Sequence, residues 1–129
     1  MFECKSYKLA SHQYAKCCVS VYREHGRMTG VSLWSYSTDV CGFYFDETDG
    51  AWYIYCTGTY SQTTRKQIGW FARELCYAYA PCKIDYYGFK AIYENDIDSP
   101  LPNRLCNLEE VGAAMRLADN YSANCRPIW

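Results

Sequence analysis

The sequence lacks a charge bias, a long apolar run and a signal-like start. Its 13 basic and 14 acidic side chains leave a formal net charge of -1, which argues against a general polyanion-binding or polyanion-mimicking role. No stretch is apolar for the length that a bilayer span needs, and residues 1–10 contain no apolar signal region. We therefore expect a soluble, cytoplasmic protein without a membrane partner.

Catalytic and metal-binding patterns are missing as well. The chain has no phosphate-cradling glycine loop and no GxSxG turn, and neither of its two histidines is placed beside a cysteine by a local motif. The acidic groups in 46–49 and 94–98 lack the DxDxDG pattern of a calcium loop, so we interpret both as solvated turns. The sequence predicts no enzyme activity, no catalytic residue, no metal site and no cofactor.

Cysteine and tyrosine are unusually frequent. The nine cysteines are an odd number without a CxxC pair, which excludes complete disulfide pairing and a zinc ribbon. We expect reduced thiols that pack as small apolar groups, and a mixed site of His12 or His25 with Cys17 or Cys18 is the minor alternative. The fourteen tyrosines suit both a packed core and a contact surface.

Strand patterns dominate the first half of a predicted single domain, residues 1–129. Alternating side chains predict two hairpins, the second closed by Asp49-Gly50, and residues 1–16 are interpreted as strand or loop. Trp52 and Ile54 should face one side of the sheet and Tyr53 and Tyr55 the other. We expect an α+β fold with one antiparallel sheet of four to six strands, drawn from residues 17–24, 31–37, 39–45, 51–56 and 83–93.

The clearest single element is an amphipathic helix over residues 61–80, which should pack across this sheet. Ser61, Thr63 and Thr64 are candidate N-caps, and Thr64 followed by Gln67 fits a capping box. A shorter C-terminal helix is predicted over 107–120, although Gly112 weakens it by about 1 kcal/mol relative to alanine. One buried face of the main helix is indicated by Ile68, Phe71, Ala72, Leu75, Cys76 and Tyr79.

The opposite side of the main helix is the predicted contact surface. Arginine, tryptophan and tyrosine are the usual hot-spot residues of protein interfaces, and a cation beside aromatic rings suits such a surface. The alternative is that Trp70 lies beneath the C-terminal helix or the tail. Together with the tyrosines on the outer strand face, the predicted partner-binding residues are Lys66, Trp70, Arg73, Tyr77, Tyr53 and Tyr55.

A strand motif and a capped helix at fixed spacing resemble a pattern found in small phage and plasmid proteins. That pattern is SYxTxV, a hairpin, and then YSxTTxxHIxxFxRE, and residues 35–74 follow it. Gln67 stands where the pattern often has histidine, so the resemblance carries over no active site. The residues that match the letters of the pattern are Ser35, Tyr36, Thr38, Val40, Tyr60, Ser61, Thr63, Thr64, Ile68, Phe71, Arg73 and Glu74.

The resemblance implies a small cytoplasmic protein made by a mobile element in a bacterial host. We expect a non-enzymatic inhibitor that binds a host defence protein, such as a CRISPR-associated nuclease, in the manner of an anti-CRISPR. The alternative is a nucleic-acid-binding protein that uses the same helix face with Arg65 and Lys83, which the near-neutral charge disfavours. Self-association into a symmetric homodimer is a further way to cover an aromatic outer face.

Overall fold

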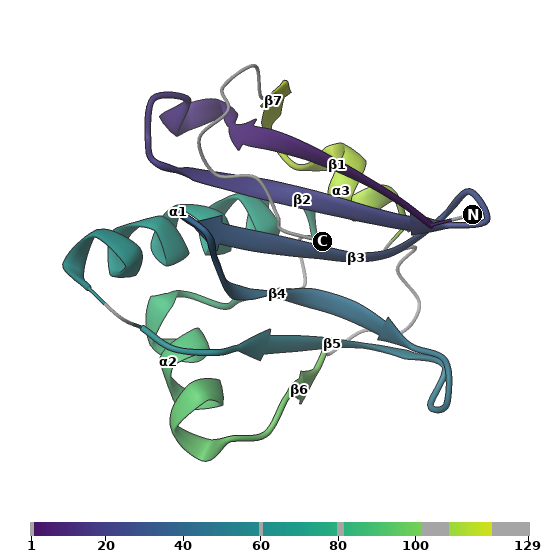
Figure 1. Ribbon diagram of the computed structural model, residues 1–129. Helices are drawn as coiled ribbons and strands as arrows, with labels where there is room; N and C mark the ends of the chain where they lie inside the picture. The colour runs from purple at the N-terminus through teal and green to yellow at the C-terminus, as the bar shows by residue number, and fades with distance from the viewer. Residues whose placement is uncertain (1, 60, 80–81, 102–108, 120–129) are drawn as a thin grey trace.

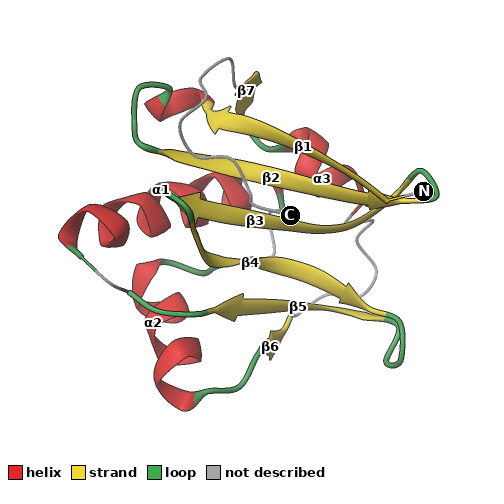
Figure 2. Ribbon diagram, in the orientation of Figure 1, coloured by secondary structure: helices red, strands yellow, loops and turns green. Residues whose placement is uncertain are grey.

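A seven-stranded antiparallel sheet with helices on one face forms the fold in the computed structural model (Figures 1 and 2). The structure describes residues 2–59, 61–79, 82–101 and 109–119. The strand order is β6-β5-β4-β3-β2-β1-β7. The elements are β1 (Phe2–Leu9), η1 (Ala10–His12, a 3-10 turn), β2 (Cys17–Glu24), β3 (Arg27–Ser35), β4 (Thr38–Asp46), β5 (Ala51–Cys56), α1 (Gln62–Ala78), α2 (Tyr86–Asn95), β6 (Ser99–Pro100), α3 (Glu109–Ala114) and β7 (Leu117–Asp119).

This architecture confirms the predicted α+β class with a single antiparallel sheet, with one strand more than the upper expectation. Both predicted hairpins are present. The β4–β5 turn uses Gly50 at φ +64°, in the left-handed region that the Asp-Gly pair indicated. The β2–β3 turn is made by His25 and Gly26, both at positive φ, and β3 begins directly after them at Arg27.

The hydrophobic core lies between the sheet and the helices, which all pack on the same face (Figure 1). Phe43 of β4 and Ile54 of β5 belong to one buried cluster with Phe71 of α1 and Phe89 of α2. The rings of Phe71 and Phe89 lie 6.1 Å apart, which joins the two helices over the sheet. Trp52 and Ile54 therefore share one face of β5, as predicted, and the structure shows that this face is the one turned to the core.

The other face of the sheet is held by hydrogen-bonded hydroxyl and aromatic groups. The Trp34 Nε1 donates to Ser32 Oγ at 2.8 Å and to the Tyr22 hydroxyl at 3.1 Å, and Tyr22 and Ser32 are 2.7 Å apart. Gly42 of β4 pairs with Ser32, and the strands approach so closely there that a Cβ on Gly42 would stand 2.1 Å from the Val31 carbonyl oxygen. Close strand approach and directional bonds therefore act on this side together with a small buried apolar cluster of Cys18 and Trp34.

The prediction of a strand or hairpin over residues 83–93 is wrong, because most of that segment forms α2. Its aromatic and β-branched residues favour strands. The Asp85 side chain instead accepts a hydrogen bond from the Gly88 backbone at 2.9 Å and caps a helix that buries Phe89 completely. Tertiary packing of one aromatic ring and a good N-cap outweigh the local strand preference.

The predicted C-terminal helix over 107–120 is too long. Helix α3 spans Glu109–Ala114, while residues 107, 108 and 120 lie outside the described part of the chain. After α3 the chain forms β7, whose Leu117 pairs with Leu9 of β1. An extended segment there supplies partners for backbone groups on the edge of β1, which a longer helix would not do.

Helix α1 agrees with the predicted helix, but its cap differs from the capping box of Thr64 and Gln67. Ser61 is the N-cap, and its Oγ accepts from the Thr64 backbone at 3.3 Å. Thr64 and Gln67 lie inside the helix and are buried. Within the described residues, no helix is both long and apolar enough to cross a membrane.

Candidate partner-binding surface

Helix α1 presents a cationic and aromatic outer side opposite the core. Its buried arc, which includes Ile68, Phe71 and Leu75, fixes the rotation of the helix about its axis. Residues on the remaining arc therefore point to solvent. Arg65, Lys66, Arg73 and Tyr77 are exposed there, and we call these four residues the α1 surface.

Trp70 lies at the border of the α1 surface and is half-buried. Its indole stacks on the His12 ring of η1, with ring centroids 3.7 Å apart and planes 9° apart. Trp70 also packs against the core cluster. It therefore holds the segment after β1 against α1, and only part of the indole is available to a partner.

Tyr77 is the aromatic residue of the α1 surface, and 69% of its area is accessible. The Arg116 guanidinium lies 5.8 Å from the centroid of the Tyr77 ring. Because Arg116 is itself exposed and comes from the turn between α3 and β7, it adds a cation to this end of the surface.

Arg65 connects the α1 surface to helix α2. Its guanidinium lies 4.8 Å from the Tyr86 ring and 5.5 Å from the Tyr87 ring, and its Nη2 donates to the Tyr87 hydroxyl at 2.8 Å. Tyr87 is 61% exposed, so this pair is open to a partner. Stacking on two rings holds the planar guanidinium in one orientation.

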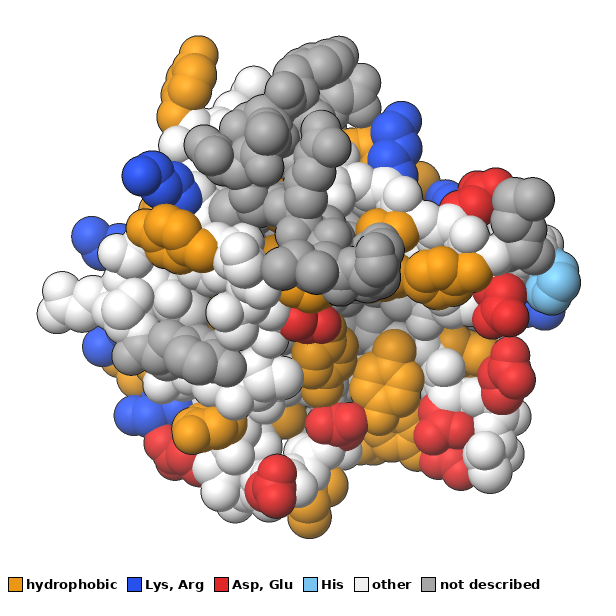
Figure 3. Space-filling view, in the orientation of Figure 1, with side chains coloured by type: hydrophobic (Ala, Val, Ile, Leu, Met, Phe, Trp, Pro, Cys, Tyr) orange, Lys and Arg blue, Asp and Glu red, His pale blue; other side chains and the backbone are white. Residues whose placement is uncertain are grey.

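No exposed carboxylate interrupts the α1 surface within the helix. Glu74 is the single acidic residue of α1, and it is only 4% exposed. The local charge of the α1 surface is therefore positive, although the net charge of the chain is -1. Figure 3 shows Lys and Arg side chains along the left side of the molecule, where Figure 1 places α1.

Gly69 lies among the side chains of the α1 surface. A glycine in a helix interior costs roughly 1 kcal/mol relative to alanine. A Cβ at Gly69 would meet nothing within 4 Å, so packing inside the protein does not require this glycine. Its effect is to keep the helix backbone accessible beside Arg65, Lys66 and Arg73.

The structure does not bring Tyr53 and Tyr55 together with the α1 surface. Both side chains point to the sheet face that is turned away from the helices. The Tyr53 hydroxyl donates to the Asp49 carboxylate, and the Tyr53 ring stacks on Tyr44 with centroids 5.9 Å apart. Tyr55 is largely engaged within the protein, because its hydroxyl donates to Asp39 at 2.7 and 3.0 Å.

Asp39 is the most perturbed carboxyl group in the described chain. Burial raises the pKa of Asp39 from 3.8 to about 6, while the Tyr55 hydrogen bond acts in the opposite direction. Burial, and after it the Asp39 charge, raise the pKa of Tyr55. This hydrogen-bonded pair joins β5 to the start of β4.

Two of the cysteines that the structure describes, Cys41 and Cys82, have raised thiol pKa values. Burial raises the pKa of the Cys41 thiol well above its ordinary value and that of Cys82 to about 12, so both thiols stay protonated at neutral pH. Protonated thiols are poor nucleophiles and poor metal ligands. In the part of the chain that the structure describes, no group of three or more His, Cys, Asp or Glu side chains could hold a metal ion.

Several residues of this site were not predicted from the sequence. Tyr87 would have been placed beside Arg65 only if residues 86–95 had been interpreted as a helix, and nothing local connects Arg116 with Tyr77. Gly69 did carry a signal, because an interior helix glycine opposite the core has no packing role. Comparisons of the chain with protein-family models, with curated proteins and with solved structures found no match.

Proposed function

We propose that this protein is a non-enzymatic inhibitor made by a phage or another mobile element. It acts in the cytoplasm of the bacterial host by binding a defence protein, such as a CRISPR-associated nuclease, in the manner of an anti-CRISPR. The observation that carries the proposal is the α1 surface, a helix side with exposed cations and tyrosine and without an exposed carboxylate. The mobile-element setting rests on the resemblance of residues 35–74.

The composition of the α1 surface favours a partner that is acidic where it makes contact. Arginine and tyrosine are typical hot-spot residues, and their cations gain most from a complementary negative patch. Nucleases that bind DNA or RNA also carry acidic catalytic centres, which hold metal ions. A cationic helix placed over such a centre would block cleavage without any chemistry of its own.

Bacterial immunity assays test this function. A strain with an active CRISPR system should regain phage plating when it expresses the protein, and the double variant K66E/R73E should lose that effect. Lys90→Glu on α2 reverses a charge outside the α1 surface, at a half-exposed side chain paired with Glu94, and this control should behave as wild type. No rescue across the CRISPR types tested, or full rescue by the double variant, would count against the proposal.

Gly69 provides a second test that leaves the charge unchanged. Gly69→Leu should fold normally, because a side chain there meets open space and leucine favours helices. A bulky group in the middle of the α1 surface should nevertheless weaken partner binding and inhibition. Gly69→Ala is the matched small substitution and should keep most of the activity. Equal inhibition by all three proteins would place the contact elsewhere.

A second candidate function is nucleic-acid binding by the same surface. It is favoured by Arg65, which is held against Tyr86 and Tyr87 in the way that base-stacking sites combine cations and rings. Fluorescence anisotropy with labelled single-stranded and duplex oligonucleotides should then show affinity that falls steeply with salt. Absence of binding at low salt eliminates this candidate, and light scattering of the protein alone separates both functions from homodimer formation.

A further inference from the structure

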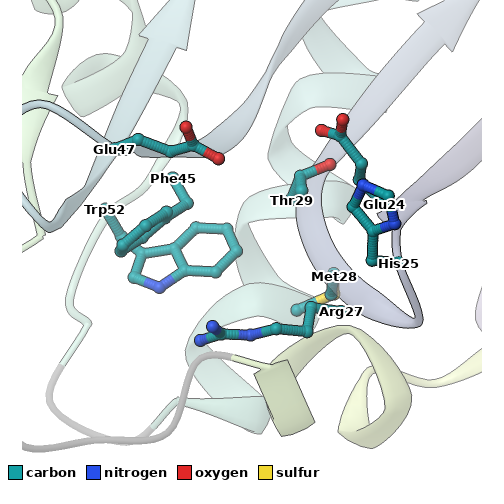
Figure 4. Close-up of a pocket in the computed structure, with 8 residues that line it drawn as sticks. All are labelled: Glu24, His25, Arg27, Met28, Thr29, Phe45, Glu47 and Trp52. Atoms are coloured by element: carbon teal, nitrogen blue, oxygen red, sulfur yellow. The ribbon is translucent and has the colours of Figure 1, made fainter. Parts of the chain in front are cut away.

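A pocket of about 380 Å³ opens between the ends of the two hairpins, away from the α1 surface (Figure 4). One side is formed by the β2–β3 hairpin and the other by β4 and β5. None of the predicted partner-binding residues lines this pocket. Its lining residues are Glu24, His25, Arg27, Met28, Thr29, Phe45, Glu47 and Trp52.

The apolar wall of the pocket is well supported. The rings of Trp52 and Phe45 lie 5.5 Å apart with their planes at 57°, and Trp52 also packs edge-on against the core residue Phe43 at 5.8 Å. Met28 is only 4% exposed and joins the wall to the core. This wall can accept a flat or branched apolar group without rearranging.

The charged side chains of the pocket point to different sides of its opening, although Glu24 and Arg27 are cross-strand partners at the end of the β2–β3 hairpin. In Figure 4 the carboxylates of Glu24 and Glu47 lie toward one side of the opening, and the Arg27 guanidinium extends toward the other, beneath Trp52. All three side chains are exposed. Within the described part of the chain, no ion pair joins Arg27 to either glutamate.

We propose that this pocket binds a small zwitterion with a large apolar side chain, of the chemical class of a free α-amino acid. The ligand ammonium group would face Glu24 and Glu47, and its carboxylate would receive the two parallel donors of Arg27. Its side chain would pack on Trp52, Phe45 and Met28. This proposal is independent of the α1 surface and of the partner bound there.

Ligands with a single charge fit the pocket less well. A simple cation would satisfy the glutamates but would also meet Arg27, and a simple anion would meet two carboxylates. Only a molecule with both charges places an opposite charge next to each group. The size of the pocket and its aromatic wall favour a side chain of the size of leucine or phenylalanine over glycine.

Three related probes test the proposal by isothermal titration calorimetry on the full chain. They are L-phenylalanine, 2-phenylethylamine without the carboxylate, and 3-phenylpropanoate without the ammonium group. L-Phenylalanine should bind at least about tenfold more tightly than either analogue, because each analogue leaves either the glutamates or Arg27 without an opposite charge. No saturable binding of L-phenylalanine up to on the order of 10 mM, or equal affinity for all three, overturns the proposal.

Two variants test which charged side of the pocket binds which end of the ligand. Arg27→Gln should weaken the affinity for L-phenylalanine and 3-phenylpropanoate several-fold and leave that for 2-phenylethylamine unchanged. Glu47→Gln should weaken the affinity for L-phenylalanine and 2-phenylethylamine and leave that for 3-phenylpropanoate unchanged. Lys90→Gln and Glu94→Gln remove the same charges from α2, far from the pocket, and should change no affinity. If Arg27→Gln and Glu47→Gln affect the three probes equally, the binding mode is wrong.

Trp52→Phe tests the apolar wall. It should weaken L-phenylalanine and both analogues by a similar factor, about threefold to tenfold, because all three share the ring. Circular dichroism and urea unfolding show whether the variant keeps its fold. Unchanged affinity in a folded Trp52→Phe variant overturns the placement of the side chain on this wall, and the two charge variants decide the proposal if the variant does not fold.

Discussion

The two faces of the central sheet are built from the same strands but are stabilised in different ways. On the helix-covered face, Val31 and Phe43 are buried among apolar side chains of α1, α2 and α3. On the opposite face, Ser32 is equally buried, at 1% exposure, but it is held by hydrogen bonds to Trp34 and Tyr22. Alternate residues of one strand therefore serve two kinds of interaction.

This difference sets what each face tolerates. Apolar burial scales with area and is non-directional, so the covered face should accept changes that keep volume and lose stability when volume is lost. Hydrogen bonds depend on distance and angle, so the opposite face should be sensitive to loss of a donor or to a shift between strands. Four changes, ordered by expected effect, test the contrast.

Phe43→Ala should have the largest effect, a loss of about 3–5 kcal/mol in the free energy of unfolding. Phe43 is 1% exposed and lies between the sheet and the helices, so its removal leaves a cavity in the main cluster. Urea unfolding followed by circular dichroism measures the change. Ile97→Ala is the control, because Ile97 is 72% exposed and should change stability by less than about 0.5 kcal/mol.

Gly42→Ala should be the most damaging small change on the opposite face. The new Cβ would stand 2.1 Å from the Val31 carbonyl oxygen and 2.8 Å from the Ser32 Cα, so β3 and β4 must move apart. We expect a loss of about 1–3 kcal/mol in urea unfolding. Gly69→Ala in α1 is the matched control and should be neutral or stabilising by up to about 1 kcal/mol, since its Cβ meets no atom. Equal effects would remove the contrast.

Trp34→Phe keeps an aromatic ring but removes the Nε1 donor shared by Ser32 and Tyr22. We expect a loss of about 1–2 kcal/mol, because the buried Ser32 hydroxyl and the half-buried Tyr22 hydroxyl lose a partner while keeping each other. The matched comparison is Trp52→Phe on the covered face, where no such donor is lost. If both variants lose stability to the same degree, ring volume and not hydrogen bonding governs the opposite face.

Asp39 should give this face a pH dependence. Its pKa of about 6 in the folded protein lies above the ordinary value of 3.8, so between about pH 4 and pH 6 the folded state holds a proton that the unfolded state has lost. The contribution of Asp39 to the free energy of unfolding therefore falls as the pH rises through this window. Because Asp39 is partly exposed, we expect a decrease on the order of 1 kcal/mol.

Urea unfolding of the wild type and of Asp39→Asn at pH 4, 5 and 7 measures this contribution. The difference in stability between the two proteins should shift in favour of the variant as the pH rises, because asparagine carries no charge to bury and still accepts from Tyr55. A difference that is constant across the window would show that Asp39 keeps an ordinary pKa in the folded protein.

Local patterns predicted much of the fold for clear reasons. The period of α1, the alternation of β2 to β5 and the Asp49-Gly50 turn are set by residues close in sequence. The prediction for residues 83–93 was wrong because the tyrosines and isoleucines of this segment favour a strand locally. Its helix depends on the burial of Phe89 against Phe71, a contact between two separate elements.

The candidate site was predictable only in part. Lys66, Arg73 and Tyr77 do lie together on the outer side of α1, as the helical period indicated. Trp70 is partly covered because η1 folds back and places His12 on the indole. Tyr53 and Tyr55 belong to another face of the molecule, a separation that follows from which side of the sheet the helices cover.

The sequence by itself determined which side of α1 is apolar, where the hairpins turn and which residues of β5 share a face, because these depend on period and on local backbone preference. Tertiary structure alone decided that Arg116 lies over Tyr77, that Tyr86 and Tyr87 hold Arg65, and that two hairpin ends enclose a charged aromatic pocket. Each of these joins residues distant in the chain, and such contacts depend on strand register and on helix placement across the whole sheet, which no local pattern encodes.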